Sequence, residues 1–152
     1  MNDELRELYQ EIILEHGRHP RHRGLPEGAT HQAEGFNPLC GDRVQVGLRL
    51  QDGTLSAVGF EGSGCAISQA AASVMAEAVA GRSEQEAREL AARFRRLVRG
   101  EEEADLETLG DLAAFAGVAQ FPMRVKCATL AWHTLIAALD GRKEADVQEE
   151  AP

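Results

Sequence analysis

Three cysteines, Cys40, Cys65 and Cys127, carry the most reactive side chains in this chain of 152 residues. Because their number is odd, they cannot pair completely into disulfides within one chain. The N-terminal sequence MNDELRELYQ is acidic and amphipathic, and it lacks the basic and apolar regions of a secretion signal. We therefore expect a cytoplasmic protein whose thiols stay reduced.

The segment 37–42, with the sequence NPLCGD, places Cys40 in a turn. Pro38 and Gly41 are typical turn residues, and a clear strand follows directly. Asp42 comes two residues after the cysteine, so the thiol and the carboxylate can approach one point.

The other two cysteines are predicted at or near the starts of helices. Cys65 follows the sequence EGSG and joins a strand to a helix, where the positive end of the helix dipole favours a thiolate. Gly64 permits unusual backbone angles and the close approach of another group. Cys127 follows Arg124 and Lys126, whose positive charge also favours a thiolate.

Three thiolates and one carboxylate are enough ligands for a tetrahedral metal site. Sulfur ligands select zinc, copper(I) or iron–sulfur species over magnesium or calcium. The cysteine spacing contains no C-x-x-C pair, and by itself it favours three unrelated thiols. The glycine-rich and basic sequences around the cysteines favour a shared site instead, with inert buried thiols as the alternative.

Apolar periodicity predicts an opening helix over residues 3–16. Its apolar stripe consists of Leu5, Leu8, Ile12 and Ile13. Residues 16–26 form a basic, turn-rich segment that reads as a loop. This segment contains three histidines: His16, His19 and His22. Because Pro20 interrupts any helical register among them, we interpret these histidines as solvated rather than as metal ligands.

Alternating apolar residues predict strands over residues 44–50 and 55–60, joined by a turn at Asp52-Gly53. The two strands keep one buried face only if a bulge or a longer turn shifts their register. A weaker strand is expected around residues 30–36.

The apolar period then changes to that of helices, which we expect at about 67–79, 83–98, 109–116 and 122–140. The order of helix, strands and helices predicts an α+β fold, with a small antiparallel sheet of about three strands packed against a layer of helices. We expect a single domain over residues 1–152, ordered to about residue 142 and with a flexible tail over 143–152.

Composition argues against two classes of partner. Sixteen basic and 25 acidic residues give a net charge of −9, which would repel the phosphate backbone of nucleic acid. No segment approaches the roughly 20 consecutive apolar residues of a membrane helix. The acidic segment 99–107 is expected to be exposed.

Three segments in this order resemble the IscU/NifU N-terminal family of iron–sulfur cluster assembly proteins. They are NPLCGD at 37–42, GCAIS at 64–68 and RVKCATLAW at 124–132. The resemblance runs from about Leu5 to Leu139, although His22 stands where the family commonly has asparagine. It implies a SufE/NifU-like single domain.

Two features are similar to the SufU branch of this family. Lys126 precedes the last cysteine, where IscU proteins carry a histidine that can bind metal. Extra sequence over residues 99–120 precedes Cys127, as in SufU proteins. The chain also has FPMRVK at 121–126 in place of the chaperone-recognition segment of IscU, so hand-off to a dedicated chaperone is not expected.

The resemblance implies a zinc site formed by Cys40, Asp42, Cys65 and Cys127. It also implies a partner, a PLP-dependent cysteine desulfurase (SufS-like) that holds a persulfide, with Cys40 as the catalytic sulfur acceptor. In the family, a histidine of the desulfurase replaces this cysteine on zinc, and the freed thiolate attacks the outer sulfur. Arg124 and Lys126 would support the site or contact the partner, and a downstream iron–sulfur scaffold or apo-proteins would receive the sulfur.

Three functions stay open at this point. The first is a zinc-dependent sulfurtransferase, and the second is a scaffold that assembles a [2Fe–2S] cluster for apo-proteins. The third is a structural zinc module that only mediates interactions. Lys126 in place of histidine weighs against the scaffold, and a loop position for Cys40 weighs against the structural module.

Overall fold

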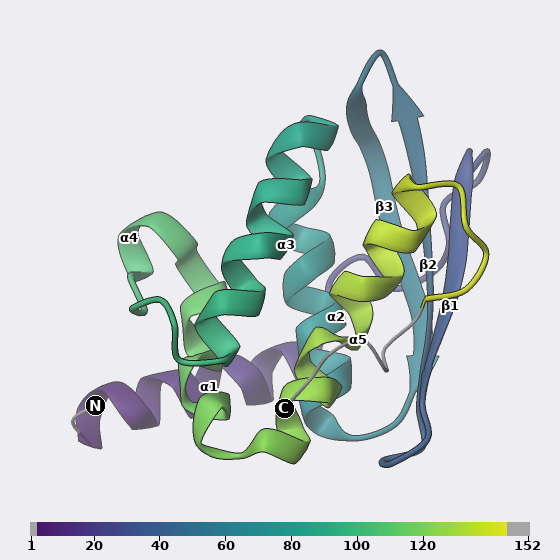
Figure 1. Ribbon diagram of the computed structural model, residues 1–152. Coiled ribbons are helices and arrows are strands. Elements are labelled where there is room, and N and C mark those ends of the chain that lie inside the picture. The colour runs from purple at the N-terminus through teal and green to yellow at the C-terminus, as the bar shows by residue number, and fades with distance from the viewer. Residues whose placement is uncertain (1–2, 146–152) are drawn as a thin grey trace.

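A three-stranded antiparallel sheet forms one side of the molecule, and helices cover one of its faces (Figure 1). The computed structural model describes residues 3–145. The strands are β1 (His31–Asn37), β2 (Asp42–Gln51) and β3 (Thr54–Ser63), in the order β1-β2-β3. The helical segments are α1 (Asp3–Arg18), α2 (Ala66–Val79), α3 (Glu84–Val98), α4 (Leu106–Leu109), the 3-10 helix η1 (Gly110–Gln120) and α5 (Pro122–Leu139). The predicted α+β class is confirmed.

The hairpin of β2 and β3 contains the predicted bulge. The register shifts after Arg49, so that Ser56 of β3 stands opposite no residue of β2. Because of this shift, Leu55, Val58 and Phe60 all belong to the buried core. The bulge therefore makes the predicted turn at residues 52–53 compatible with one buried apolar face on both strands.

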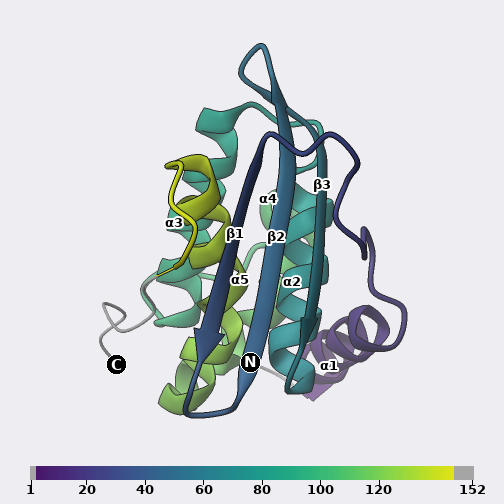
Figure 2. The same ribbon diagram turned by 90° about the vertical axis from the view of Figure 1, so that its right-hand side faces the viewer.

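Two helices lie directly on the sheet (Figure 2). α5 packs against β1 and β2, and α2 packs against β3. α3 lies outside α5, and α1 crosses α2 and η1 (Figure 1). Since α5 is enclosed between the sheet and α3, its residues Leu130, Leu135 and Leu139 are buried, and Trp132 stacks on Phe94 of α3.

The opening helix differs from its prediction in two respects. Leu8 is 44% exposed, because the buried face of α1 is centred on Tyr9 and His16. These two residues are seven positions apart and share one helix face. The prediction that His16 lies in a solvated loop is wrong, because α1 continues to Arg18 and encloses this ring. His19 and His22 are exposed, as predicted.

The end of the described chain is paired with the edge of β1. The Glu34 amide donates to the carbonyl of Lys143 at 2.8 Å, and the Ala145 amide donates to the carbonyl of Glu34 at 2.9 Å. The flexible tail was expected from residue 143, and its first three residues instead cover a sheet edge. The rest of that expected tail, 146–152, lies outside the described residues.

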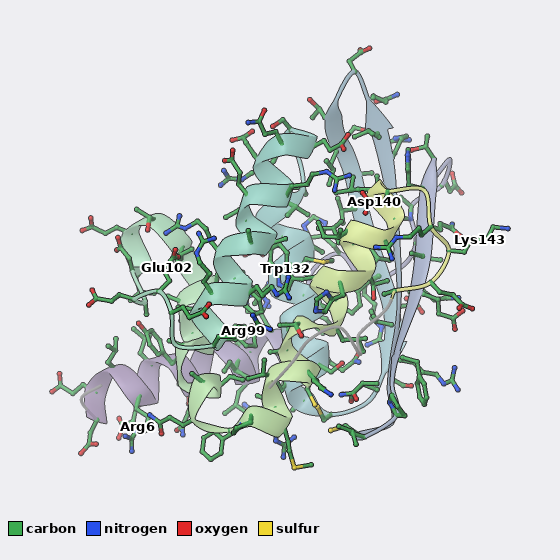
Figure 3. The ribbon with its side chains drawn as sticks, in the orientation of Figure 1. Arg6, Arg99, Glu102, Trp132, Asp140 and Lys143 are labelled. Carbon is green, nitrogen blue, oxygen red and sulfur yellow. The ribbon has the colours of Figure 1, made fainter. Side chains whose placement is uncertain are left out.

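Residues 99–120 connect α3 to α5 through α4 and η1, where one short helix over 109–116 was predicted. Most of the acidic segment is exposed, as predicted, but Glu102 pairs with Arg93 at 3.0 Å and with Arg96 at 3.2 Å (Figure 3). Within residues 3–145, no helix is both long enough and apolar enough to cross a membrane.

Candidate metal centre

The turn between β1 and β2 and the second turn of α5 bring three predicted ligands to one point. The ligand atoms of Cys40, Asp42 and Cys127 all lie within 4.8 Å of one another. The two sulfur atoms are 3.1 Å apart. Cys40 is partly exposed, whereas Asp42 and Cys127 are fully buried. The group therefore joins one accessible thiol to two ligands inside the core.

Asp42 occupies the first position of β2, and its carboxylate is held by neutral donors. Its Oδ1 accepts a hydrogen bond of 2.8 Å from the backbone amide of Cys65. The side-chain amide of Asn37 lies 3.5 Å from Oδ2 and 3.6 Å from the sulfur of Cys127. Burying a charged carboxylate among neutral groups costs free energy, which a bound cation would offset. The environment of Asp42 thus fits a metal ligand.

Gly64 leaves the space that the Asp42 side chain occupies. Its φ is +142°, and a Cβ built there would lie 2.3 Å from Asp42 Oδ1 and 2.8 Å from Asp42 Cα. A side chain at this position would displace the carboxylate. The sequence prediction of a close approach before Cys65 is therefore confirmed.

Cys65 is the N-cap residue of α2, as its sequence context predicted. Its Sγ accepts a hydrogen bond of 3.4 Å from the amide of Ser68. The thiol is not part of the group of three ligand atoms. Instead, Cys65 lines a hollow of about 840 Å³ between α1, η1 and the start of α5. The ligand atoms of Cys40, Asp42 and Cys127 therefore meet, and Cys65 adjoins this group through its backbone amide.

Cys127 lies in the second turn of α5, near the helix start as predicted, and it is fully buried. Its protonation differs from the prediction. Burial raises the pKa of the Cys127 thiol well above its ordinary value, and hydrogen bonds with Cys40 and Asp42 add to the shift. Arg124 is exposed and Lys126 is partly exposed, and their charge does not overcome this burial. A metal ion at this thiol would have to displace its proton.

Apolar side chains project into solvent around the cluster, and sequence analysis did not single them out. They come from the β1–β2 turn region and from the start of α5: Phe36, Leu39, Phe121 and Met123. Their exposed fractions range from 39% to 64%. A signal was present, because Phe36 and Leu39 lie within four residues before the turn cysteine, and Phe121 and Met123 flank Pro122 shortly before the last cysteine. Exposed apolar groups gathered near a site are typical of an interaction surface.

A second group of ligating atoms was also missed. His16, Glu77 and Asp111 place their ligand atoms within 4.8 Å of one another. Nε2 of His16 lies 2.8 Å from an Asp111 oxygen, and Nδ1 lies 2.7 Å from the hydroxyl of Ser73. Glu77 lies 3.7 Å from the guanidinium of Arg21. These contacts tie α1, α2 and η1 together.

The chain matches the family described as "NifU-like N terminal domain" over residues 8–128. It is 37% identical over 144 residues to the iron–sulfur cluster assembly scaffold protein IscU of Streptococcus pyogenes, a match that covers 95% of this chain and 89% of the relative. It is also 37% identical over 134 residues to the zinc-dependent sulfurtransferase SufU of Bacillus subtilis, with coverage of 88% and 90%.

Solved structures show the same similarity. A putative SufU scaffold protein from Fervidobacterium islandicum is 38% identical, with a TM-score of 0.80 and coverage of 88% of this chain and 97% of that one. The N-terminal domain of a NifU-like protein from Brucella abortus is 25% identical, with a TM-score of 0.80 and coverage of 95% and 97%.

The fold and the cluster together define a small α+β protein that combines thiol and carboxylate ligands at one sheet end. This chain belongs to the NifU-like N-terminal domain family, as its three cysteine segments predicted. Its relatives carry both the IscU and the SufU names, so their names do not choose between the branches. Lys126 and the segment 99–120 are the features that favour the SufU side.

Proposed function

We propose that this protein acts in iron–sulfur cluster assembly as a zinc-dependent sulfurtransferase that accepts sulfur on Cys40. The position of Cys40 carries the proposal. Among the three clustered ligands, this thiol lies on a surface turn, whereas Asp42 and Cys127 are buried. A thiolate that exchanges sulfur with another protein needs such access. The similarity to a named zinc-dependent sulfurtransferase supports the same function.

The zinc ligands in this proposal are Cys40, Asp42, Cys65 and Cys127. The backbone of Cys65 is already held by its hydrogen bond to Asp42. Its thiol would exchange the hydrogen bond with the amide of Ser68 for the metal. Thiolates and a carboxylate suit zinc, which would keep the thiols deprotonated and offset the buried charge of Asp42 when bound.

The sulfur donor would be a PLP-dependent cysteine desulfurase that carries a persulfide. The thiolate of Cys40 attacks the outer sulfur of that persulfide and forms a new S–S bond. The donor's S–S bond breaks, and its cysteine leaves as a thiolate, so no external oxidant is needed. The exposed apolar side chains around Cys40 give this partner a surface to bind, and Arg124 adds a positive charge at its edge.

Persulfide mapping tests this assignment directly. After incubation with desulfurase and cysteine, mass spectrometry of peptides should find the added sulfur on Cys40. The Cys40→Ala variant should lose both this label and the acceleration of desulfurase turnover, while circular dichroism shows a folded protein. Sulfur carried on Cys65 or Cys127, or full acceleration by Cys40→Ala, would contradict the proposal. A purely structural zinc module would instead show reduced stability in every ligand variant and no label in the parent.

The second candidate is a scaffold that builds a [2Fe–2S] cluster on the same ligands. The equal identity to a relative named as a scaffold protein supports it. Elemental analysis of protein purified without oxygen separates the two functions. About one zinc per chain without iron or sulfide favours sulfur transfer. Iron and acid-labile sulfide in similar amounts would make cluster assembly the leading function.

A further inference from the structure

The three cysteines differ in access to solvent and in the contacts of their sulfur atoms. Cys40 is partly exposed on the turn between β1 and β2, and Cys127 is fully buried in α5. Their sulfur atoms are 3.1 Å apart, and the thiol of Cys127 donates to the sulfur of Cys40. The thiol of Cys65 instead accepts from the amide of Ser68 and lies outside the group of three ligand atoms. The accessible thiol is therefore in direct contact with one buried thiol, and that thiol is Cys127.

The turn that carries Cys40 has room to move toward α5. This turn and the start of α5 lie at the same end of the molecule (Figure 1, Figure 2). The side chain of Leu39 is 61% exposed, and a Cβ built on Gly41 would meet no atom within 4 Å. A disulfide has a sulfur–sulfur distance of about 2.05 Å, so the two sulfur atoms must approach by about 1 Å. We expect the open turn, rather than the buried helix, to make this approach.

We propose that Cys40 and Cys127 form a site of reversible oxidation, at which a hydroperoxide converts the two thiols of the metal-free protein into an intramolecular disulfide. Contact between the sulfur atoms and access to one of them are the observations that support this site. The bond removes two of the three clustered ligand atoms, so zinc cannot bind there. It also blocks the sulfur acceptor. This last consequence rests on the proposed function, whereas formation of the disulfide does not require sulfur transfer.

The reaction uses one hydroperoxide for two thiols. The sulfur of Cys40 attacks one oxygen of hydrogen peroxide, the O–O bond breaks, and the products are a sulfenic acid and water. The sulfur of Cys127 then attacks the sulfur of Cys40 and displaces the hydroxyl group. The proton of the Cys127 thiol, which already points toward Cys40, leaves with this hydroxyl as a second water. The two thiols lose two electrons to the peroxide, and a small dithiol reverses the bond by exchange.

Peptide mapping tests the proposal directly, because trypsin cleaves after arginine and lysine and separates the three cysteines. Cys40 falls on the peptide 24–43, Cys65 on 50–82 and Cys127 on 127–142. The full chain is treated with hydrogen peroxide after zinc removal, and mass spectrometry without reduction identifies linked peptides. We expect the peptides of Cys40 and Cys127 to be linked and Cys65 to remain a free thiol. Zinc rebinding should be lost and should return after treatment with a dithiol.

Matched cysteine-to-serine variants locate the link. Cys65→Ser should form the disulfide at a rate within about twofold of the parent rate, because its thiol takes no part in the exchange. Cys127→Ser should form no intramolecular link, and dimedone should trap the sulfenic acid on Cys40. Where Cys127→Ser fails to fold, peptide mapping of the parent decides. The proposal is overturned if the main link involves the peptide of Cys65, if it joins two chains, or if Cys40 is oxidised in the parent without a link.

Zinc-loaded protein separates this proposal from the proposed function. Both thiols would be occupied by zinc, so the disulfide should form at least about fivefold more slowly than in the metal-free chain. Equal rates would contradict the assignment of Cys40 and Cys127 as zinc ligands and would leave the disulfide standing. A persulfide on Cys40, together with no Cys40–Cys127 disulfide in the metal-free chain, would overturn this inference and leave the proposed function standing.

Discussion

The two groups of ligating atoms in this domain differ in what the protein already supplies to them. At Cys40, Asp42 and Cys127, the donors that hydrogen-bond to the buried carboxylate within residues 3–145 are neutral, and burial keeps the Cys127 thiol protonated. At His16, Glu77 and Asp111, both nitrogens of the buried ring have hydrogen-bond partners, and the exposed glutamate lies beside an arginine. In both groups the ligand atoms lie within 4.8 Å of one another.

Closeness of ligand atoms is therefore not enough to identify a metal site. A cation gains most where it compensates buried groups that the protein leaves unsatisfied, and least where it must replace existing hydrogen bonds. Sulfur donors add selectivity for zinc in the first group only. We interpret the cysteine group as the metal centre and the histidine group as a structural clasp between α1, α2 and η1.

The largest expected difference between the two groups is in metal content. Cys127→Ser should lower zinc affinity at least about 100-fold, since losing a ligand costs more than losing an outer hydrogen-bond partner. Asp111→Asn keeps an oxygen acceptor for His16 and should leave zinc content unchanged. Competition with a chromophoric chelator measures both affinities. Equal zinc loss in the two variants would show that the cysteine group and the histidine group do not differ in zinc binding.

Gly64→Ala should disturb the cysteine group through its backbone. The new Cβ collides with Asp42, so we expect about 2–4 kcal/mol less free energy of unfolding and weaker zinc binding. Gly53→Ala is a matched control, because its φ of +79° is also unfavourable for alanine but nothing lies within 4 Å. Gly53→Ala should lower the free energy of unfolding by about 1 kcal/mol. Equal losses in urea unfolding would show that the contact with Asp42 is unimportant.

His16→Ala should affect stability without affecting metal. The substitution leaves Ser73 and Asp111 without their partner and opens a cavity under α1, so we expect a loss of about 2–3 kcal/mol. The exposed His19→Ala should change the free energy of unfolding by less than about 0.5 kcal/mol. Zinc content should match the parent in both variants. Zinc loss in His16→Ala alone would assign this histidine to the metal centre.

The smallest expected effect is on how the free energy of unfolding of the metal-free protein depends on pH. Because the pKa of Cys127 is raised by folding, its thiol stays protonated where the unfolded thiol ionises. The stability associated with this thiol is full below the ordinary thiol pKa of about 8.5, and it is lost as pH rises above that value. Urea unfolding between pH 7.5 and 10 should show a steeper decline for the parent than for Cys127→Ala. Parallel declines would mean that the buried thiol does not control this dependence.

Local sequence patterns predicted the turns and helix caps, which are formed by a few residues close together in the chain. The predicted turn at Asp52-Gly53 joins β2 to β3, and the helix predicted from residue 83 begins with a capping box between Ser83 and Glu86. Cys65 caps α2, as its glycine-rich context indicated. In each case the interacting groups are within a few residues of one another, so the sequence pattern contains the whole interaction.

The sequence by itself determined the family, the α+β class and the order of elements, and it supplied the four residues that we propose as metal ligands. Only the tertiary structure decided which ligand atoms meet and which thiol stays protonated. It also decided that His16 is enclosed, since its partners Ser73 and Asp111 lie 57 and 95 residues away. The physical reason is that burial and long-range hydrogen bonds depend on every element packed around a group. A local pattern records only the neighbours along the chain.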